Sequence, residues 1–174
     1  FEDEMVGYLP HCTFNLDPRA ASIDTPLHAY VPKKHVEHVH SDSIIAIAAS
    51  VNSRELTAEL FGDEIGWLPW KKPGYELGLW LEKLATENPQ MRGAVLESHG
   101  LFTWADDAKD CYLTTLDIIN KAAAWLEART AGKPAFGGQK LPTLPADQRR
   151  AVAARLMPAI RGLISQDRHK VGHF

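Results

Sequence analysis

The chain has 174 residues, of which 45% are hydrophobic and 24% charged, and its formal net charge is -3 at pH 7. These values are typical of a single globular domain, and they exclude a disordered chain or a collagen-like repeat. A net charge this small gives no general attraction to nucleic acid or to an anionic membrane, so neither is expected as a partner.

Cysteine usage indicates a reducing compartment. Cys12 and Cys111 lie far apart, in no spacing typical of a disulfide framework or a thiolate zinc site. There is no secretory leader and no apolar run of membrane-spanning length, so the expected location is cytoplasmic. Because the sequence opens without Met and stops without a closing element, we expect a piece of a longer protein that lacks an N-terminal part.

The charges are unevenly distributed. Acidic residues predominate over residues 1–127, whereas residues 128–174 are strongly basic. The basic end could bind an anion or nucleic acid, or it could be a helix that docks on an acidic body or on another domain. Charge runs are more often solvated or docked faces than ligand sites, which favours the second interpretation.

Helices and strands alternate along the first 131 residues. Period-2 patterns predict strands and apolar positions three or four residues apart predict helices. The expected helices are 24–30, 42–48, 53–61, 74–88 and 105–131, and the expected strands are 35–40, 65–70, 91–96 and 101–104. The last helix is identified by its apolar residues Tyr112, Leu116, Ile119, Ala123 and Leu126. This interleaving indicates a layered α/β domain.

The composition divides the chain into three segments. Residues 1–131 form the main domain, and residues 132–145, rich in Pro and Gly and without periodicity, form a linker. Residues 146–174 are expected to be a basic amphipathic helix and a tail.

Two histidines suggest a metal centre. His38 and His40 are two positions apart on a predicted strand, so their imidazoles project from one face. His99 is the best third ligand, because it lies where a strand breaks before Gly100. Three neutral imidazoles with one open position are typical of catalytic zinc. Spacing alone leaves open that these histidines are merely solvated, and that His28 and His35 compete as ligands.

Three ordered motifs carry a family resemblance. They are Ala21-Ser22-Ile23-Asp24-Thr25-Pro26-Leu27-His28, then His35-Val36-Glu37-His38-Val39-His40, then Glu97-Ser98-His99-Gly100. Together they resemble the class II aldolase/adducin family, and in particular the rhamnulose-1-phosphate aldolase-like domains of bifunctional aldolase/short-chain dehydrogenases. The resemblance implies a three-layer α/β/α fold with a central, largely antiparallel sheet. It also implies a homotetramer and metal ligation by His38, His40 and His99.

The implied activity is that of a lyase in carbohydrate metabolism. A zinc-dependent aldolase of this family, with cobalt or manganese as other possible metals, reversibly cleaves a ketose 1-phosphate to dihydroxyacetone phosphate and an aldehyde. Asp24 matches the family's catalytic Glu with one methylene fewer, although an Asp here could equally cap the helix that follows. Ser22 matches the family's substrate-binding Ser, and its alternative is a loop hydroxyl bonded to its own backbone.

Two departures keep other functions open. No segment of residues 1–20 resembles the family's glycine-rich phosphate loop, and Asp24 replaces Glu. A sugar-phosphate epimerase or dehydratase on the same fold is therefore an alternative. So is a non-catalytic, adducin-like interaction module, which the three retained histidines disfavour.

Overall fold

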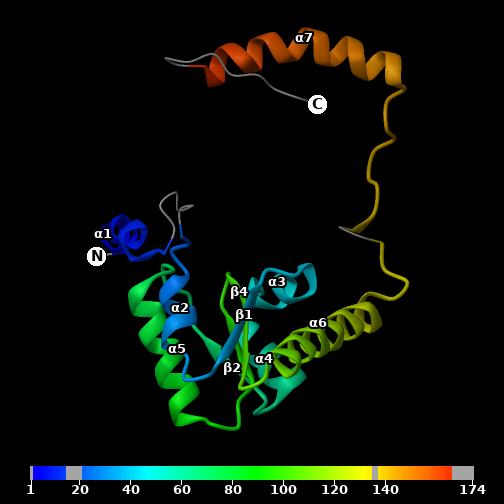
Figure 1. Cartoon of the computed structure of the whole chain (residues 1–174). Coiled ribbons are helices and arrows are strands. Elements are labelled where there is room, and N and C mark those ends of the chain that lie inside the picture. The colour runs from blue at the N-terminus through cyan, green and yellow to red at the C-terminus, as the bar shows by residue number, and fades with distance from the viewer. Residues whose placement is uncertain (1, 15–20, 135–136, 166–174) are drawn as a thin grey trace. The chain divides into compact units, whose positions relative to one another are not determined.

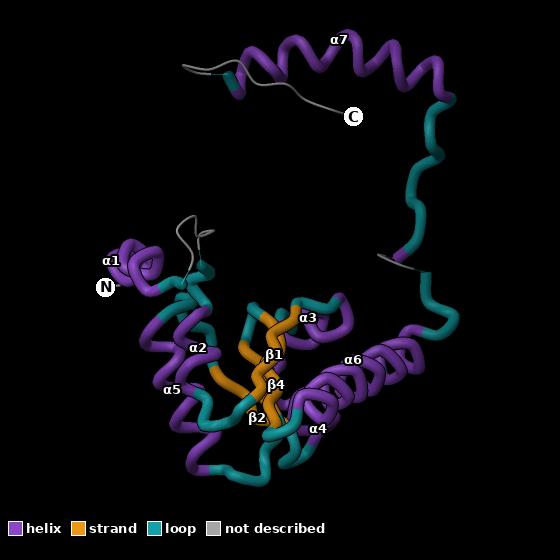
Figure 2. The backbone as a smooth tube through the Cα atoms, viewed as in Figure 1, coloured by secondary structure: helices purple, strands orange, loops and turns teal. Residues whose placement is uncertain are grey.

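The structure is a computed structural model that describes residues 2–14, 21–134 and 137–165. The chain divides into two compact units, Phe1–Ala131 and Gly132–Phe174. The first unit contains a sheet with helices on both sides, as Figures 1 and 2 show. The second contains the single described α-helix α7 (Ala146–Ile164), which has no buried residue. The predicted tail after that helix lies outside the described residues.

Four strands form one mixed sheet in the order β1-β4-β3-β2. Their bounds are β1 (His35–Val39), β2 (Ile65–Leu68), β3 (Gly93–Leu96) and β4 (Gly100–Ala105). β4 pairs antiparallel with both β1 and β3, whereas β2 pairs parallel with β3. The expectation of a largely antiparallel sheet is therefore confirmed, with one parallel pair at the β2 edge.

Helices cover both faces of this sheet, which gives the expected three layers. α2 (Thr25–Tyr30) and α5 (Tyr75–Glu87) pack on one face. α3 (Asp42–Ala48), α4 (Ser53–Phe61) and α6 (Ala108–Thr130) pack on the other face. Two separate apolar cores result, because neighbouring strand residues point to opposite faces: Ala94 and Leu96 enter the first core and Val95 the second.

The stripe that identifies α6 in the sequence is not the face that the sheet covers. The buried residues of α6 are Cys111, Thr114, Thr115, Ile118 and Ala122. The two threonines are buried because their hydroxyls find partners: Thr115 donates to Glu37 at 2.6 Å and Thr114 to the Asp110 carbonyl at 2.7 Å.

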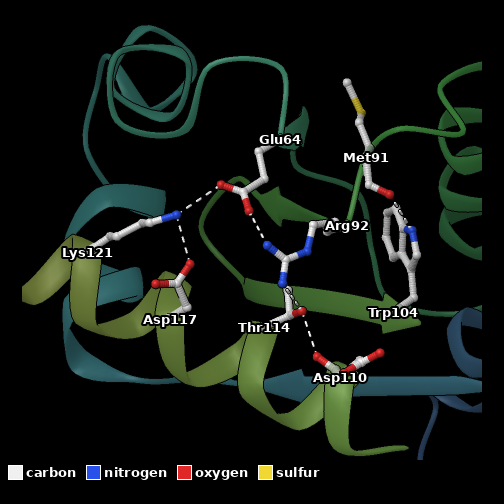
Figure 3. A network of polar contacts seen from close by, with 8 residues as sticks. All are labelled: Glu64, Met91, Arg92, Trp104, Asp110, Thr114, Asp117 and Lys121. Atoms are coloured by element: carbon white, nitrogen blue, oxygen red, sulfur yellow. Dashed lines mark hydrogen bonds and ion pairs between the residues drawn. The ribbon is translucent and has the colours of Figure 1, made fainter. Parts of the chain in front are cut away.

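Polar side chains are paired at the end of the sheet where β3 begins. Figure 3 shows Arg92 donating to Glu64 at 2.5 Å and to the hydroxyl of Thr114. Lys121 contacts the same Glu64 at 3.0 Å and Asp117 at 2.7 Å. These contacts tie the start of β3 to α6.

Two short helices at the start of the chain were not predicted. They are α1 (Glu2–Tyr8) and a 3-10 turn, Leu9–Cys12, and neither contains a buried residue. Glu2 accepts the backbone N–H of Tyr75 at 2.6 Å, which joins α1 to the first turn of α5. Across the described ranges, no helix combines the length and apolar character needed to cross a membrane.

Candidate metal centre

One ring nitrogen of His38 is hydrogen-bonded, and the other has no hydrogen-bond partner among the described residues. Its Nδ1 lies 2.9 Å from the carbonyl oxygen of Leu101 on the neighbouring strand. Because a carbonyl only accepts, Nδ1 carries the proton and the lone pair remains on Nε2. The ring stacks on Phe102, with centroids 4.0 Å apart and planes 11° apart. This orientation is typical of an imidazole prepared to bind a metal through Nε2.

His99 is presented by a tight turn between β3 and β4. Ser98 adopts φ 53°, a left-handed conformation uncommon for a residue with a side chain. The turn is fixed by two backbone bonds: Ser98 N–H donates to Ala48 at 2.8 Å, and His99 N–H donates to Leu96 at 3.1 Å. The strained turn thus places the His99 ring beside the end of β1.

The three predicted histidines converge. The His38 centroid lies 4.5 Å from that of His40 and 4.9 Å from that of His99, and His40 and His99 are 5.1 Å apart. One nitrogen from each ring can be chosen so that all three lie within 4.8 Å of one another. The side chains of His38 and His99 are each 11% exposed, whereas His40 is exposed. The cluster therefore combines two buried rings with one at the surface.

Asp24 points toward this cluster rather than capping α2. Its Oδ2 lies 4.0 Å from His38 Nε2, and its Oδ1 lies 3.9 Å from His99 Nε2. Within the described part of the chain, the Asp24 side chain makes no capping hydrogen bond. The capping interpretation of Asp24 is therefore wrong in this structure, and the carboxylate faces the imidazoles.

Ser22 holds Asp24 in this position. Its hydroxyl donates to Asp24 Oδ2 at 3.3 Å and accepts the Asp24 backbone N–H at 3.1 Å. The bond to the backbone agrees with the interpretation of Ser22 as a loop hydroxyl that bonds its own backbone. The bond to the carboxylate adds a positioning contact.

The buried imidazoles are held in their neutral form. Burial lowers the pKa of His38 from 6.5 to about 4, opposed by the Leu101 carbonyl and the Asp24 carboxylate. Burial also lowers the pKa of His99, again opposed by Asp24. Neutral imidazole is the form that binds metal, so protons compete weakly for these two rings near pH 7.

Gly100 makes room for the rings. A Cβ added there would lie 2.5 Å from His40 Cδ2 and 2.8 Å from the Val39 carbonyl oxygen. Both distances are shorter than any ordinary contact, so only glycine lets β4 approach the end of β1 and His40 this closely.

Other candidates from the sequence do not join the cluster. His28 lies near it, with its ring 5.3 Å from Phe102 and 6.5 Å from His38, but is not among the grouped ligands. His35 pairs with Ala105 at the opposite end of the sheet. Lys71 and Lys72 are paired with carboxylates instead, Lys71 with Glu76 at 2.6 Å and Lys72 with Asp3 at 3.0 Å.

The donor set fits a divalent transition metal. Among the described residues, four buried side-chain atoms have no hydrogen-bond partner: Asp24 Oδ1, His38 Nε2, Ser41 Oγ and His99 Nδ1. Burial without a partner is unfavourable, and three of these atoms belong to the cluster formed by the three histidines and Asp24. Imidazole nitrogens with a nearby carboxylate suit zinc, cobalt or manganese.

The sequence did not identify every residue of this site. Phe102, on which His38 stacks, follows only once β1 is known to pair with β4. The pairing register is the information that the sequence lacked.

Comparison with known proteins places this site in a family context. The family model for the class II aldolase and adducin N-terminal domain matches residues 7–126. An uncharacterised oxidoreductase of Bacillus subtilis (strain 168), YuxG, is 35% identical over 98% of this chain. The chain spans only 25% of the length of that relative.

Two solved structures are similar in fold. One is the N-terminal class II aldolase domain of a conserved protein from Thermoplasma acidophilum, with a TM-score of 0.63 and 29% identity. That match covers 72% of this chain and 58% of the other. The second is an L-fuculose 1-phosphate aldolase, with a TM-score of 0.50 and 16% identity over 80% of this chain and 66% of the other. At that identity the second likeness is one of fold alone.

Proposed function

Because the chain belongs to the class II aldolase and adducin N-terminal domain family, we propose that it is the metal-binding part of an aldolase. His38, His40 and His99 would hold the metal, with zinc as the first candidate and cobalt or manganese as others. The observation that carries this proposal is the convergence of three imidazoles beside a carboxylate, with buried atoms that lack partners.

The proposed reaction is the reversible cleavage of a ketose 1-phosphate to dihydroxyacetone phosphate and an aldehyde. A substrate resembling rhamnulose 1-phosphate is the first to test, given the motif resemblance. When bound, the metal would supply Lewis-acid polarisation of the substrate carbonyl. The protein would act in the cytoplasm, as its cysteine usage indicates, and as a homotetramer, as the family resemblance implies.

Asp24 is the residue proposed to move the proton. Its Oδ1 is buried and lacks a partner among the described residues, so one carboxylate oxygen can accept or return a proton. Its other oxygen is held by Ser22 at 3.3 Å. Ser22 is thus proposed to position the base as well as to contact substrate.

A metal measurement tests the first part of the proposal. We expect about one zinc per chain in the untagged protein and none in a His38→Ala, His40→Ala double variant. The matched control is a His28→Ala, His35→Ala double variant, which removes two histidines near in sequence but outside the cluster and should keep its zinc. A protein that takes up no zinc, cobalt or manganese contradicts the proposal.

A cleavage assay tests the second part. Release of dihydroxyacetone phosphate from rhamnulose 1-phosphate is measured on this chain and on the full-length protein that contains it. Asp24→Asn should lower kcat by roughly a hundredfold or more while zinc content stays near one per chain. Asp24→Glu should keep activity within about tenfold, because it restores the family carboxylate.

Other products would identify the alternatives. Isomerised or dehydrated sugar phosphate in place of cleavage indicates the epimerase or dehydratase. Bound zinc with no turnover of any sugar phosphate indicates the adducin-like interaction module.

A further inference from the structure

His28 is an imidazole that lies one helical turn from Asp24. The backbone N–H of His28 donates to the Asp24 carbonyl oxygen at 3.4 Å, so the two residues share one face of α2. Leu27, which precedes His28, is fully buried in the first core and fixes this helix against the sheet. Because Asp24 faces the three imidazoles of the metal centre, His28 lies at the edge of the same site.

Ring contacts place His28 beside the predicted metal ligands but outside their group. Its ring centroid is 5.3 Å from that of Phe102 and 6.5 Å from that of His38, with interplanar angles of 62° and 71°. The three predicted ligands are closer to one another, with centroids 4.5 to 5.1 Å apart. His28 is therefore not a fourth ligand, yet it is near enough to contact a molecule bound at the metal.

The ring nitrogens of His28 are available to such a molecule. Within the ranges that the structure describes, this ring makes aromatic contacts and no hydrogen bond or ion pair. Edge-to-face contacts orient an aromatic ring without using its polar atoms. A neutral imidazole has one N–H donor and one acceptor nitrogen, which together suit a hydroxyl group.

The charge of Asp24 decides which part of a sugar phosphate lies beside His28. A carboxylate one turn away repels a phosphate dianion, so the phosphate is disfavoured here. The carbonyl half of the substrate belongs with the metal. The part that remains is the half that leaves as the aldehyde, which in rhamnulose 1-phosphate carries an uncharged hydroxyl next to the new carbonyl.

We infer that His28 binds the substrate, and that its imidazole hydrogen-bonds the hydroxyl of the half that leaves as a 2-hydroxyaldehyde. This inference rests on the proposed function and adds to it a residue that selects among aldehydes. In this role His28 neither binds the metal nor transfers a proton.

Aldehyde preference in the reverse reaction tests the inference. Dihydroxyacetone phosphate is joined to lactaldehyde or to propanal, which differ only in the hydroxyl next to the carbonyl. We expect kcat/KM to favour lactaldehyde by about tenfold in the wild type and by less than about twofold in His28→Phe, which keeps an aromatic ring without a donor. The matched control is His35→Phe, which replaces an exposed imidazole at the opposite end of the sheet and should keep the wild-type preference.

The outcomes separate this inference from the proposed function. If His28 only packs against Phe102 and His38, its replacement changes kcat/KM for both aldehydes by the same factor, and that result overturns the inference alone. A zinc-loaded wild type that joins dihydroxyacetone phosphate to neither aldehyde contradicts the proposed aldolase function, and the inference with it.

Binding without turnover gives a second measurement. In Asp24→Asn protein, calorimetry compares the dissociation constants of rhamnulose 1-phosphate and of dihydroxyacetone phosphate. Adding His28→Phe should raise the first constant by about fivefold or more and the second by less than about twofold, because dihydroxyacetone phosphate lacks the aldehyde half. An equal rise for both ligands would place His28 beside the phosphate or the carbonyl half, and would overturn the assignment to the aldehyde half.

Discussion

The two ends of the four-stranded sheet differ in whether their polar side chains are paired. Where β3 begins, Arg92, Glu64 and Lys121 are joined by direct contacts, as Figure 3 shows. Where β1 ends, the Asp24 carboxylate lies within 4.0 Å of a ring nitrogen of His38 and of His99, yet three side-chain atoms of these residues lack partners among the described residues. Each such atom costs about 1–3 kcal/mol, whereas a paired group stabilises the fold.

This difference distinguishes a region whose polar groups stabilise the fold from the proposed metal site. Polar and ionisable side chains lie at both ends, so their presence alone does not identify a ligand site. Incomplete pairing does, because a stable protein keeps unpaired buried groups chiefly where a ligand supplies the missing partner. Three measurements of the free energy of unfolding, made on metal-free protein, should distinguish the two ends.

Acidification should give the largest effect, and it should act through the histidine end. The pKa of His38 is about 4 in the folded protein and 6.5 in the unfolded chain, so the unfolded chain binds the proton at higher pH. Above about pH 6.5 His38 is neutral in both states and does not lower the free energy of unfolding. As pH falls from 6.5 toward 4, proton binding by the unfolded chain lowers that free energy by on the order of 3 kcal/mol.

Urea unfolding at pH 7 and pH 4.5 with a chelator measures this loss. His38→Asn keeps an N–H for the Leu101 carbonyl but cannot titrate, so it should flatten much of the dependence. Asp106, which follows β4 and pairs with Lys33 at 2.7 Å, should respond only at lower pH, because Lys33 lowers the pKa of this carboxyl below its ordinary value. Equal pH dependence of the wild type and His38→Asn would refute this assignment.

Gly100→Ala should give the second largest effect. The added Cβ meets the Val39 carbonyl oxygen and the His40 ring, so β1 and β4 must separate slightly. We expect a loss of about 2 kcal/mol in stability, together with a measurable loss of zinc affinity. Gly7→Ala is the control, because Gly7 lies in α1 with open space around it. Unchanged zinc affinity in Gly100→Ala would show that the close approach does not shape the site.

Arg92→Met should give the smallest effect, and it should leave metal binding unchanged. Arg92 is about half exposed, so its ion pair with Glu64 is screened by solvent, and the expected loss is about 1 kcal/mol. Lys83→Met removes a more exposed pair with Glu87 and should change stability by less than about 0.5 kcal/mol. If Arg92→Met altered zinc affinity, the two ends of the sheet would not be independent.

Local patterns predicted much of the fold and part of the site. His38 and His40 share a face because side chains alternate along a strand, and that rule requires no tertiary information. His99 is different, because its place beside them depends on the pairing of β4 with β1. The sequence suggested His99 as the third ligand only through the strand break before Gly100 and through the family motif.

The points that the sequence left open or missed also have physical causes. Asp24 is in a position where capping is common, but its carboxylate turns to Ser22 and the histidines instead. On α6, two neighbouring sets of residues have helical spacing, and the set that contains Thr114 and Thr115 is the buried one. From its polarity alone, Thr115 would be predicted to face solvent. Its burial could not be predicted, because the partner of its hydroxyl, Glu37, is distant in sequence.

The short turn that presents His99 also determines when the site can form during folding. β3 and β4 are adjacent in the chain, so their hairpin closes a small loop and can form early. His38 reaches Leu101 across 63 positions, a contact that forms late because closing a long loop is entropically unfavourable. Because the three imidazoles meet only once β1 has paired with β4, we expect a metal that needs all three to slow unfolding more than it accelerates folding.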